Sequence, residues 1–197
     1  MPHPDAASLT PAEVRQLPDT DERAVLLAAL WIDNQAETTL GWDRPAVITQ
    51  FVHRPDRSTA PAATTIPIGL ADPGPMVDKI AGLARKLPVV PLLRDRLVRS
   101  DDTYLGVAFI TEGWITTKDA TTKNPLVANA GRVEARIIYG LHSNGNRFRV
   151  ERHRNGQPRV TFRDLRIRGN EAGVDEALAQ LNDAFNLAYG NPPAKRD

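Results

Sequence analysis

The sequence contains no cysteine. A disulfide framework, a thiolate metal site and a cysteine nucleophile are therefore excluded, and the fold has to be stable through packing alone. Lysine is also scarce, with five residues against 20 arginines. Almost all of the positive charge is thus carried by guanidinium groups, which match the geometry of carboxylates and phosphates.

Long apolar runs are absent as well. The longest, from Ala24 to Ile32, has nine residues, far fewer than the roughly 20 that span a bilayer. The first residues, MPHPDAASLTPAEV, contain neither the basic segment nor the apolar stretch of a signal peptide. We therefore expect a cytoplasmic protein without a membrane partner.

Motifs for nucleotides and nucleophiles are missing. The sequence has no P-loop, no GxGxxG, no GxSxG and no HExxH. Residues Gly69 to Gly74 lack the lysine and the strand-to-helix context of a phosphate loop. We expect no cofactor.

Histidine is the remaining candidate for metal binding, and the chain has four: His3, His53, His142 and His153. The turn register set out below places His142 and His153 on one face of a sheet, beside opposite turns. A strand of about seven residues, at about 3.4 Å each, separates them. We therefore expect no metal site.

Length and composition indicate one globular domain, since 197 residues with 41% hydrophobic and 25% charged content are ordinary values. We expect it to span residues 20–190, between a flexible N-terminal arm (1–19) with a short helical turn and a C-terminal tail (191–197). The turn begins at Thr10-Pro11-Ala12-Glu13, a capping box with proline at the first helical position.

Periodicity predicts helices over 21–35, 76–87 and 171–189, with a short helix starting at Pro91. Strands are predicted at 46–53 and 103–117, and three more form a meander within 132–168. These elements predict an α+β fold. Its antiparallel sheet has four to five strands, including the C-terminal three-stranded meander, and the helices pack on one face. Helix 21–35 is apolar all round, which indicates either deep burial or partial coverage by another chain.

Two turns set the register of the meander. Asn144-Gly145 favours a two-residue hairpin loop, which places Leu141 opposite Phe148 and Tyr139 opposite Val150. For the second turn, the hydrophobic pattern favours a three-residue loop with Gly156 left-handed, which places Val150 opposite Phe162.

The opposite face of the meander then carries five arginines: Arg136, Arg147, Arg149, Arg159 and Arg163. Residues 132–168 have a net charge of +7, from ten arginines and three acidic residues, while the whole chain has +1. The rest of the chain therefore carries −6, so the near-neutral total hides a segregated distribution of charge.

We predict from this segregation a non-enzymatic interaction module whose five arginines meet an anionic partner. The partner could be an acidic protein surface, a second copy of the chain or a nucleic-acid backbone. The face has no outward aromatic residue to stack on a base. A soluble surface without a partner would carry the same arginines. A subunit of a larger or phage-related assembly is a further hypothesis.

Glu112 supports the alternative, a small acid/base enzyme of hydrolase type. Its neighbours on the same strand face, Ile110 and Trp114, are apolar, and burial raises a carboxyl pKa toward the range of a general acid or base. The polar loop 118–131 would roof the cleft. The competing explanation is that Glu112 is solvated or pairs with an arginine of the meander.

The segments AFITEGWITT (108–117) and VEARIIYGLHSNGNRFRVER (133–152) together resemble small uncharacterised proteins of high-GC actinobacteria and their bacteriophages. The resemblance covers about half of the chain. It implies a provenance and no activity that could be transferred.

Overall fold

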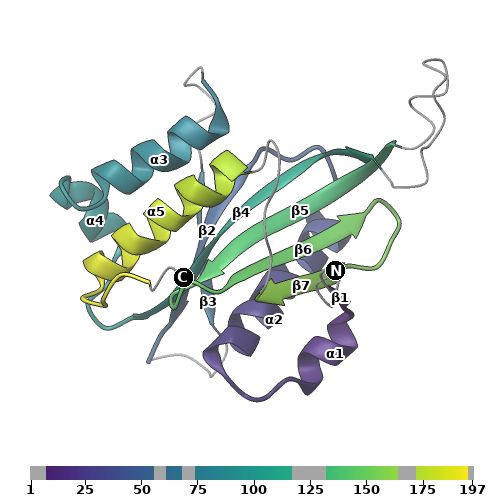
Figure 1. Ribbon diagram of the computed structural model, residues 1–197, viewed down its shortest axis with the longest axis horizontal. Helices are drawn as coiled ribbons and strands as arrows, with labels where there is room; N and C mark the ends of the chain where they lie inside the picture. Colours follow the sequence, from purple (N-terminus) through teal and green to yellow (C-terminus); the bar gives the residue numbers. More distant parts are fainter. Residues whose placement is uncertain (1–7, 56–60, 68–73, 117–131, 164–171, 195–197) are drawn as a thin grey trace, which may run out of the picture.

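The computed structural model describes residues 8–55, 61–67, 74–116, 132–163 and 172–194. They form an antiparallel sheet of seven strands in the order β1-β7-β6-β5-β4-β2-β3, with helices against it (Figure 1). The strands are β1 Ser8–Leu9, β2 Val47–His53, β3 Ala62–Pro67, β4 Thr103–Thr116, β5 Arg132–His142, β6 Arg147–His153 and β7 Arg159–Arg163. The helices are α1 Pro11–Gln16, α2 Asp21–Gln35, α3 Met76–Lys86, α4 Pro91–Leu97 and α5 Ala172–Ala188, and a π-helical turn, η1 Ala36–Leu40, extends α2. The predicted α+β class is confirmed, while the sheet exceeds the expected four to five strands.

The helices cover both faces of the sheet, so the expectation of one covered face is wrong. On one face, α1 and α2 pack on a core that includes Phe51, Ile138 and Phe148. On the other face, α3, α4 and α5 pack on a second core around Val107 and Tyr139. Strands β4 and β5 are apolar on both sides, so they lie at the centre of the sheet between two layers of helix.

The N-terminal segment belongs to the domain from residue 8 onward. Leu9 of β1 pairs with Val160 of β7, and Val14 of α1 is fully buried. The predicted capping box is present, because the Thr10 side chain accepts from the Glu13 backbone and the Glu13 carboxylate accepts from the Thr10 backbone. These contacts include residues 8–16 in the fold, so the domain begins before the expected boundary at residue 20.

The first meander turn differs from the prediction by one residue. The His142 amide donates to the Asn146 carbonyl at 2.8 Å, and Leu141 pairs with Arg147. The loop therefore has three residues, with Gly145 left-handed at φ 94°. A shift of one residue moves a whole strand to the other face, so Phe148 joins Ile138 instead of Leu141 and Tyr139.

The second turn keeps the predicted face but not the predicted register. Val150 pairs with Val160, and Phe148 pairs with Phe162, two residues away from the expected pairing. The left-handed residue is Asn155, with φ 63°, instead of Gly156. A shift of two residues leaves every side chain on its expected face, so Val150 and Val160 share the core that α2 covers.

Tyr104 anchors α5 to the sheet. Its ring stacks on Phe185 and Tyr189, with centroids 5.4 and 5.5 Å apart, and its hydroxyl donates to Asn182 Oδ1 at 2.8 Å. Burial raises the pKa of Tyr104 well above its usual value, and Tyr189 and Asp183 add to the shift.

Tyr104 should therefore make stability fall at alkaline pH. Above about pH 10 the unfolded tyrosine ionises while the folded one stays neutral, so each pH unit costs up to about 1.4 kcal/mol. Tyr104→Phe should lose about 1–2 kcal/mol at pH 7, because Asn182 loses its donor, and should flatten the alkaline slope. Urea unfolding at several pH values measures both effects. Burial also raises the Tyr189 pKa, so part of the slope persists, but equal slopes in both proteins would contradict the assignment.

Candidate functional site

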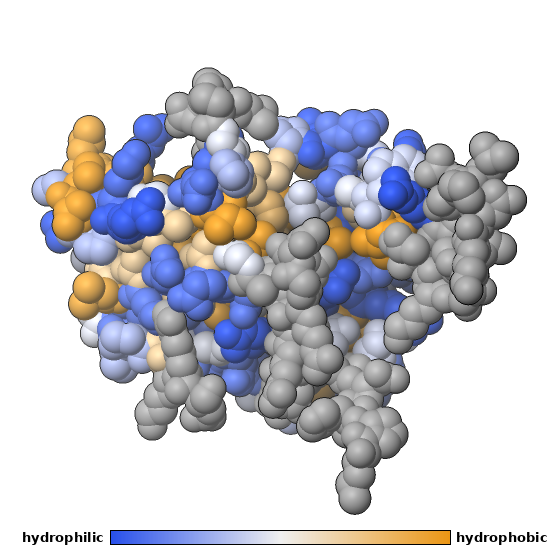
Figure 2. All heavy atoms as spheres, turned by 45° about the horizontal axis from the view of Figure 1, so that its top comes forward, coloured by the Kyte–Doolittle hydropathy of each residue, from blue (hydrophilic) through white to orange (hydrophobic). Residues whose placement is uncertain are grey.

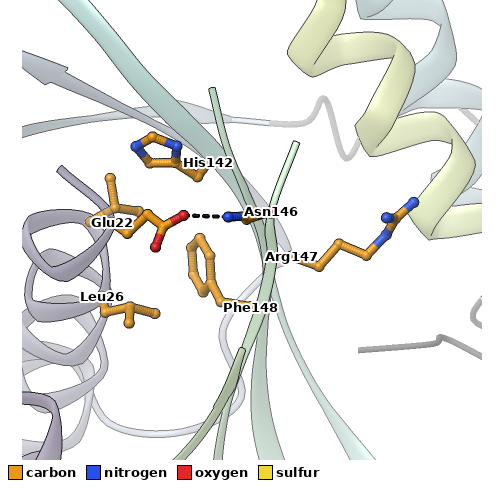
Figure 3. A pocket seen from close by; sticks show the side chains of 7 residues that line it. Glu22, Leu26, His142, Asn146, Arg147 and Phe148 are labelled. Atoms are coloured by element: carbon orange, nitrogen blue, oxygen red, sulfur yellow. Dashed lines mark hydrogen bonds between the residues drawn. The ribbon is translucent and has the colours of Figure 1, made fainter. Parts of the chain in front are cut away.

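Three of the five predicted arginines share one face of the meander. Three arginines, Arg147, Arg149 and Arg159, lie on the side of β6 and β7 that faces away from α2, because they alternate along these strands with the residues buried under α2: Phe148, Val150 and Val160. Figure 3 shows Phe148 pointing toward α2 and Arg147 pointing away from it, toward α5. We call these three residues the outer arginine face. Arg163 pairs with Arg147 in the register, and its side chain lies outside the described part of the structure.

Acidic groups are interleaved with the outer arginine face. Arg147 Nε lies 2.8 Å from Asp175 Oδ1 on α5. Arg149 lies 2.7 Å from Glu151, and its guanidinium stacks over the Tyr139 ring at 5.3 Å. Glu151 also contacts His153 at 2.7 Å. Arg147 and Arg149 are partly exposed, and Arg159 is exposed, so the face is a mixed surface that retains positive charge.

Arg136 does not belong to this face. The one-residue shift of the first turn places it on the α2 side, where it is 2% exposed. Its Nε donates to Glu112 Oε1 at 2.7 Å and its other nitrogens donate to the Gly41 and Asp33 carbonyls at 3.0 and 3.3 Å. Its guanidinium also lies 4.7 Å from the centre of the Trp42 ring. The prediction that Arg136 meets a partner is therefore corrected, because it is a buried structural residue.

Asp33 joins Arg136 to a second buried arginine. Arg152 Nε and Nη2 each lie 2.7 Å from Asp33 Oδ2, and Arg136 lies 3.6 Å from Asp33 Oδ1. Burial raises the pKa of the Asp33 carboxyl, while the hydrogen bond and charge of Arg152 and the charge of Arg136 oppose the shift. At this carboxyl the loss of hydration, together with the negative charge of Glu37, outweighs the attraction of the two guanidinium groups.

Glu112 completes the buried cluster. Its side chain is 8% exposed, and both oxygens are engaged, Oε1 by Arg136 and Oε2 by the Arg44 amide at 2.9 Å. Trp114, its expected apolar neighbour, is 68% exposed, and the loop 118–131 lies outside the described residues. These contacts match the competing explanation, a pair with a meander arginine, and they lend the acid/base alternative no support.

Three members of this cluster were not predicted from the sequence: Asp33, Arg152 and Trp42. Asp33 carried a usable signal, because it directly follows the nine-residue apolar run of α2 and a charge there needs a buried partner. No comparable signal marked Arg152, which lies among other arginines. Trp42 contacts a second guanidinium, that of Arg154, at 5.6 Å.

His142 and His153 lie on opposite faces, so their expected shared face is wrong. His142 borders a small cavity with Glu22, Asn146 and Phe148 (Figure 3). Its Nδ1 accepts from the Asn144 amide at 3.2 Å, and its buried Nε2 has no hydrogen-bond partner among the described residues. The cavity volume of about 10 Å³ holds at most one water molecule, so it is too small for a substrate.

Among the described residues, no group of three or more histidine, aspartate or glutamate side chains is arranged to hold a metal ion. In the same ranges no helix is both long enough and apolar enough to cross a membrane.

Comparison with known proteins gives no family for the chain. It matches no family model, no curated protein and no solved structure.

Proposed function

We propose that this protein is a non-enzymatic interaction module that binds an anionic partner through the outer arginine face, Arg147, Arg149 and Arg159. The observation that carries the proposal is the alternation along β6 and β7, which places Arg147, Arg149 and Arg159 on the side of the sheet away from α2, with Arg159 opposite Glu151. Among the described residues, Glu151 and Asp175 pair with arginines of this face. Three guanidinium groups against two carboxylates leave an excess of positive charge, which would attract an anion.

The partner that suits this face best is an acidic protein surface. Glu151 lies among the arginines and contacts Arg149 and His153, so it would repel a continuous phosphate backbone. The aromatic ring of the face, Tyr139, is 4% exposed and lies under Arg149, so no base can stack on it. Separate carboxylates, which arginine binds through two parallel hydrogen bonds, avoid both obstacles.

Neutralising two arginines tests the proposal. In Arg149→Gln/Arg159→Gln, binding of a labelled polyglutamate peptide at low salt should weaken about tenfold, because each exposed arginine–carboxylate pair contributes up to about 1 kcal/mol. Fluorescence anisotropy measures the change, and a short DNA duplex serves as the second probe. Arg136 stays unaltered because it is buried.

The control variant is Arg15→Gln/Arg132→Gln, which removes the same charge from two exposed arginines outside the outer arginine face. It should retain most of the peptide binding. If both variants lost the same affinity for the peptide, the loss would come from the change in net charge alone, and the proposed site would be overturned. If Arg149→Gln/Arg159→Gln weakened binding of the duplex and left binding of the peptide unaffected, the face would be assigned to nucleic acid instead.

A further inference from the structure

The turn between α3 and α4 presents large apolar side chains to solvent. Leu92 is 81% exposed, Val89 73% and Val90 38%. In Figure 1, α4 forms one end of the long axis of the molecule, and Figure 2 shows hydrophobic side chains gathered at that end beside hydrophilic ones. We call residues 85–99 the α3–α4 knuckle. It is also basic, because it exposes five cations and one aspartate: Arg85, Lys86, Arg94, Arg96, Arg99 and Asp95.

A groove lies on the outer side of α2, away from the sheet core. Its volume is about 990 Å³, and it runs between α2 and the hairpin of β2 and β3. The apolar part of its lining includes Leu27 and Trp31, and the Trp31 side chain is 60% exposed. The α2 groove therefore leaves uncovered the outer side of a helix that is apolar all round.

Two aspartates line the α2 groove, and since Asp19 is paired with Arg23, Asp21 is the acidic group left to contact a partner. Asp21 is exposed, and the Asp19 side chain is 98% exposed. The cations of the lining already have acidic neighbours, since Arg23 lies 3.2 Å from Asp19 and Arg54 lies 3.5 Å from Asp102. His53 is the remaining titratable group of the lining.

We infer that copies of this chain associate head to tail, with the α3–α4 knuckle of one copy docked in the α2 groove of the next. The knuckle is apolar and basic, and the groove is concave, apolar and edged by the exposed Asp21, so the two match in hydrophobicity and in the sign of their charge. Within one chain they cannot meet, because α3 and α4 cover one face of the sheet and α2 covers the other. Such a contact joins two different surfaces, so it builds a ring or a filament instead of a symmetric dimer.

Two single variants test the pairing. Leu92→Glu places a charge on the knuckle, and Trp31→Glu places one in the groove, and both sites are exposed enough to leave the fold intact. Light scattering after gel filtration should show the mass of the native chain rising with concentration. Each variant should lose at least tenfold in association, while its far-UV circular dichroism and urea midpoint stay unchanged. Trp114→Glu is the matched control, because Trp114 is 68% exposed, between Trp31 and Leu92, and lies outside both surfaces.

Mixing the variants separates this pairing from any other contact. Leu92→Glu retains an intact groove and Trp31→Glu retains an intact knuckle, so an equimolar mixture should form a one-to-one dimer and nothing larger. A native chain that stays monomeric at every concentration would overturn the inference. Association that survives in either variant, or a mixture that remains monomeric, would overturn it as well.

Discussion

Replacing Asp33 by alanine should cost about 3–5 kcal/mol of the free energy of unfolding, because it leaves Arg136 and Arg152 buried without their shared carboxylate. The Asp33 and Arg136 side chains are each 1% exposed and the Arg152 side chain 8%, so solvent cannot compensate either guanidinium. The remaining acidic neighbours, Glu112 and Glu37, contact Arg136. Among the described residues, Arg152 would then keep one hydrogen bond, which it donates to the Gly156 carbonyl. Urea denaturation at neutral pH measures the loss.

The control is Asp19→Ala, which removes an aspartate from a second arginine pair. Asp19 lies 3.2 Å from Arg23, with its side chain 98% exposed, so its loss should cost less than about 1 kcal/mol. The two variants remove the same chemical group and differ in burial. Similar costs would show that the Asp33 cluster is solvated in solution, contrary to the structure.

The raised pKa of Asp33 bears on whether the buried cluster stabilises the folded state. Since dehydration outweighs the attraction of two arginines at this carboxyl, the ion pairs are poor evidence of net stabilisation. We expect the cluster to contribute specificity instead, because α2 has to be placed correctly on the sheet for Asp33 to reach both Arg136 and Arg152. The large cost of Asp33→Ala thus measures the penalty of an incomplete cluster and not a surplus of stability in the complete one.

The meander shows how far the sequence could predict this fold. Asn144-Gly145 suits a two-residue loop and equally a three-residue loop with Gly145 left-handed, so turn chemistry leaves the register open. The apolar pattern could not decide between them, because β5 is apolar on both faces, with Ile137 and Tyr139 on one and Ile138 on the other. Strands β6 and β7 have one apolar face, and there the prediction of faces is confirmed.

The same ambiguity in register explains the error in the predicted set of partner-binding arginines. A one-residue error in register moved Arg136 from a buried cluster to an expected surface, whereas Arg147, Arg149 and Arg159 kept a common face. The α2 helix was predicted with its correct start and end, but its pattern could not say which side of the sheet it covers. Distinguishing a buried arginine from an exposed one required the position of Asp33, which lies 103 residues earlier in the chain than Arg136.

Phe148→Ala should cost about 3–5 kcal/mol, because it opens a cavity in the core under α2. Phe148 is 3% exposed, and its ring lies 6.4 Å from that of Phe51. It also covers Gly140, its partner across β5 and β6, so closely that a Cβ on residue 140 would overlap the ring. The native chain therefore needs glycine at 140 because phenylalanine occupies 148.

Gly140→Ala should consequently have opposite effects in two backgrounds. In the native chain it should destabilise by about 1–3 kcal/mol through overpacking. In Phe148→Ala the added methyl group would fill part of the vacated volume, so the double variant should be more stable than Phe148→Ala alone. Gly113→Ala is the control, because a Cβ there has no neighbour within 4 Å, and its effect should be the same in both backgrounds. Additive costs at 140 and 148 would show that the Phe148 ring does not cover Gly140. That result would contradict the observed register and favour the two-residue loop, in which Leu141 is opposite Phe148.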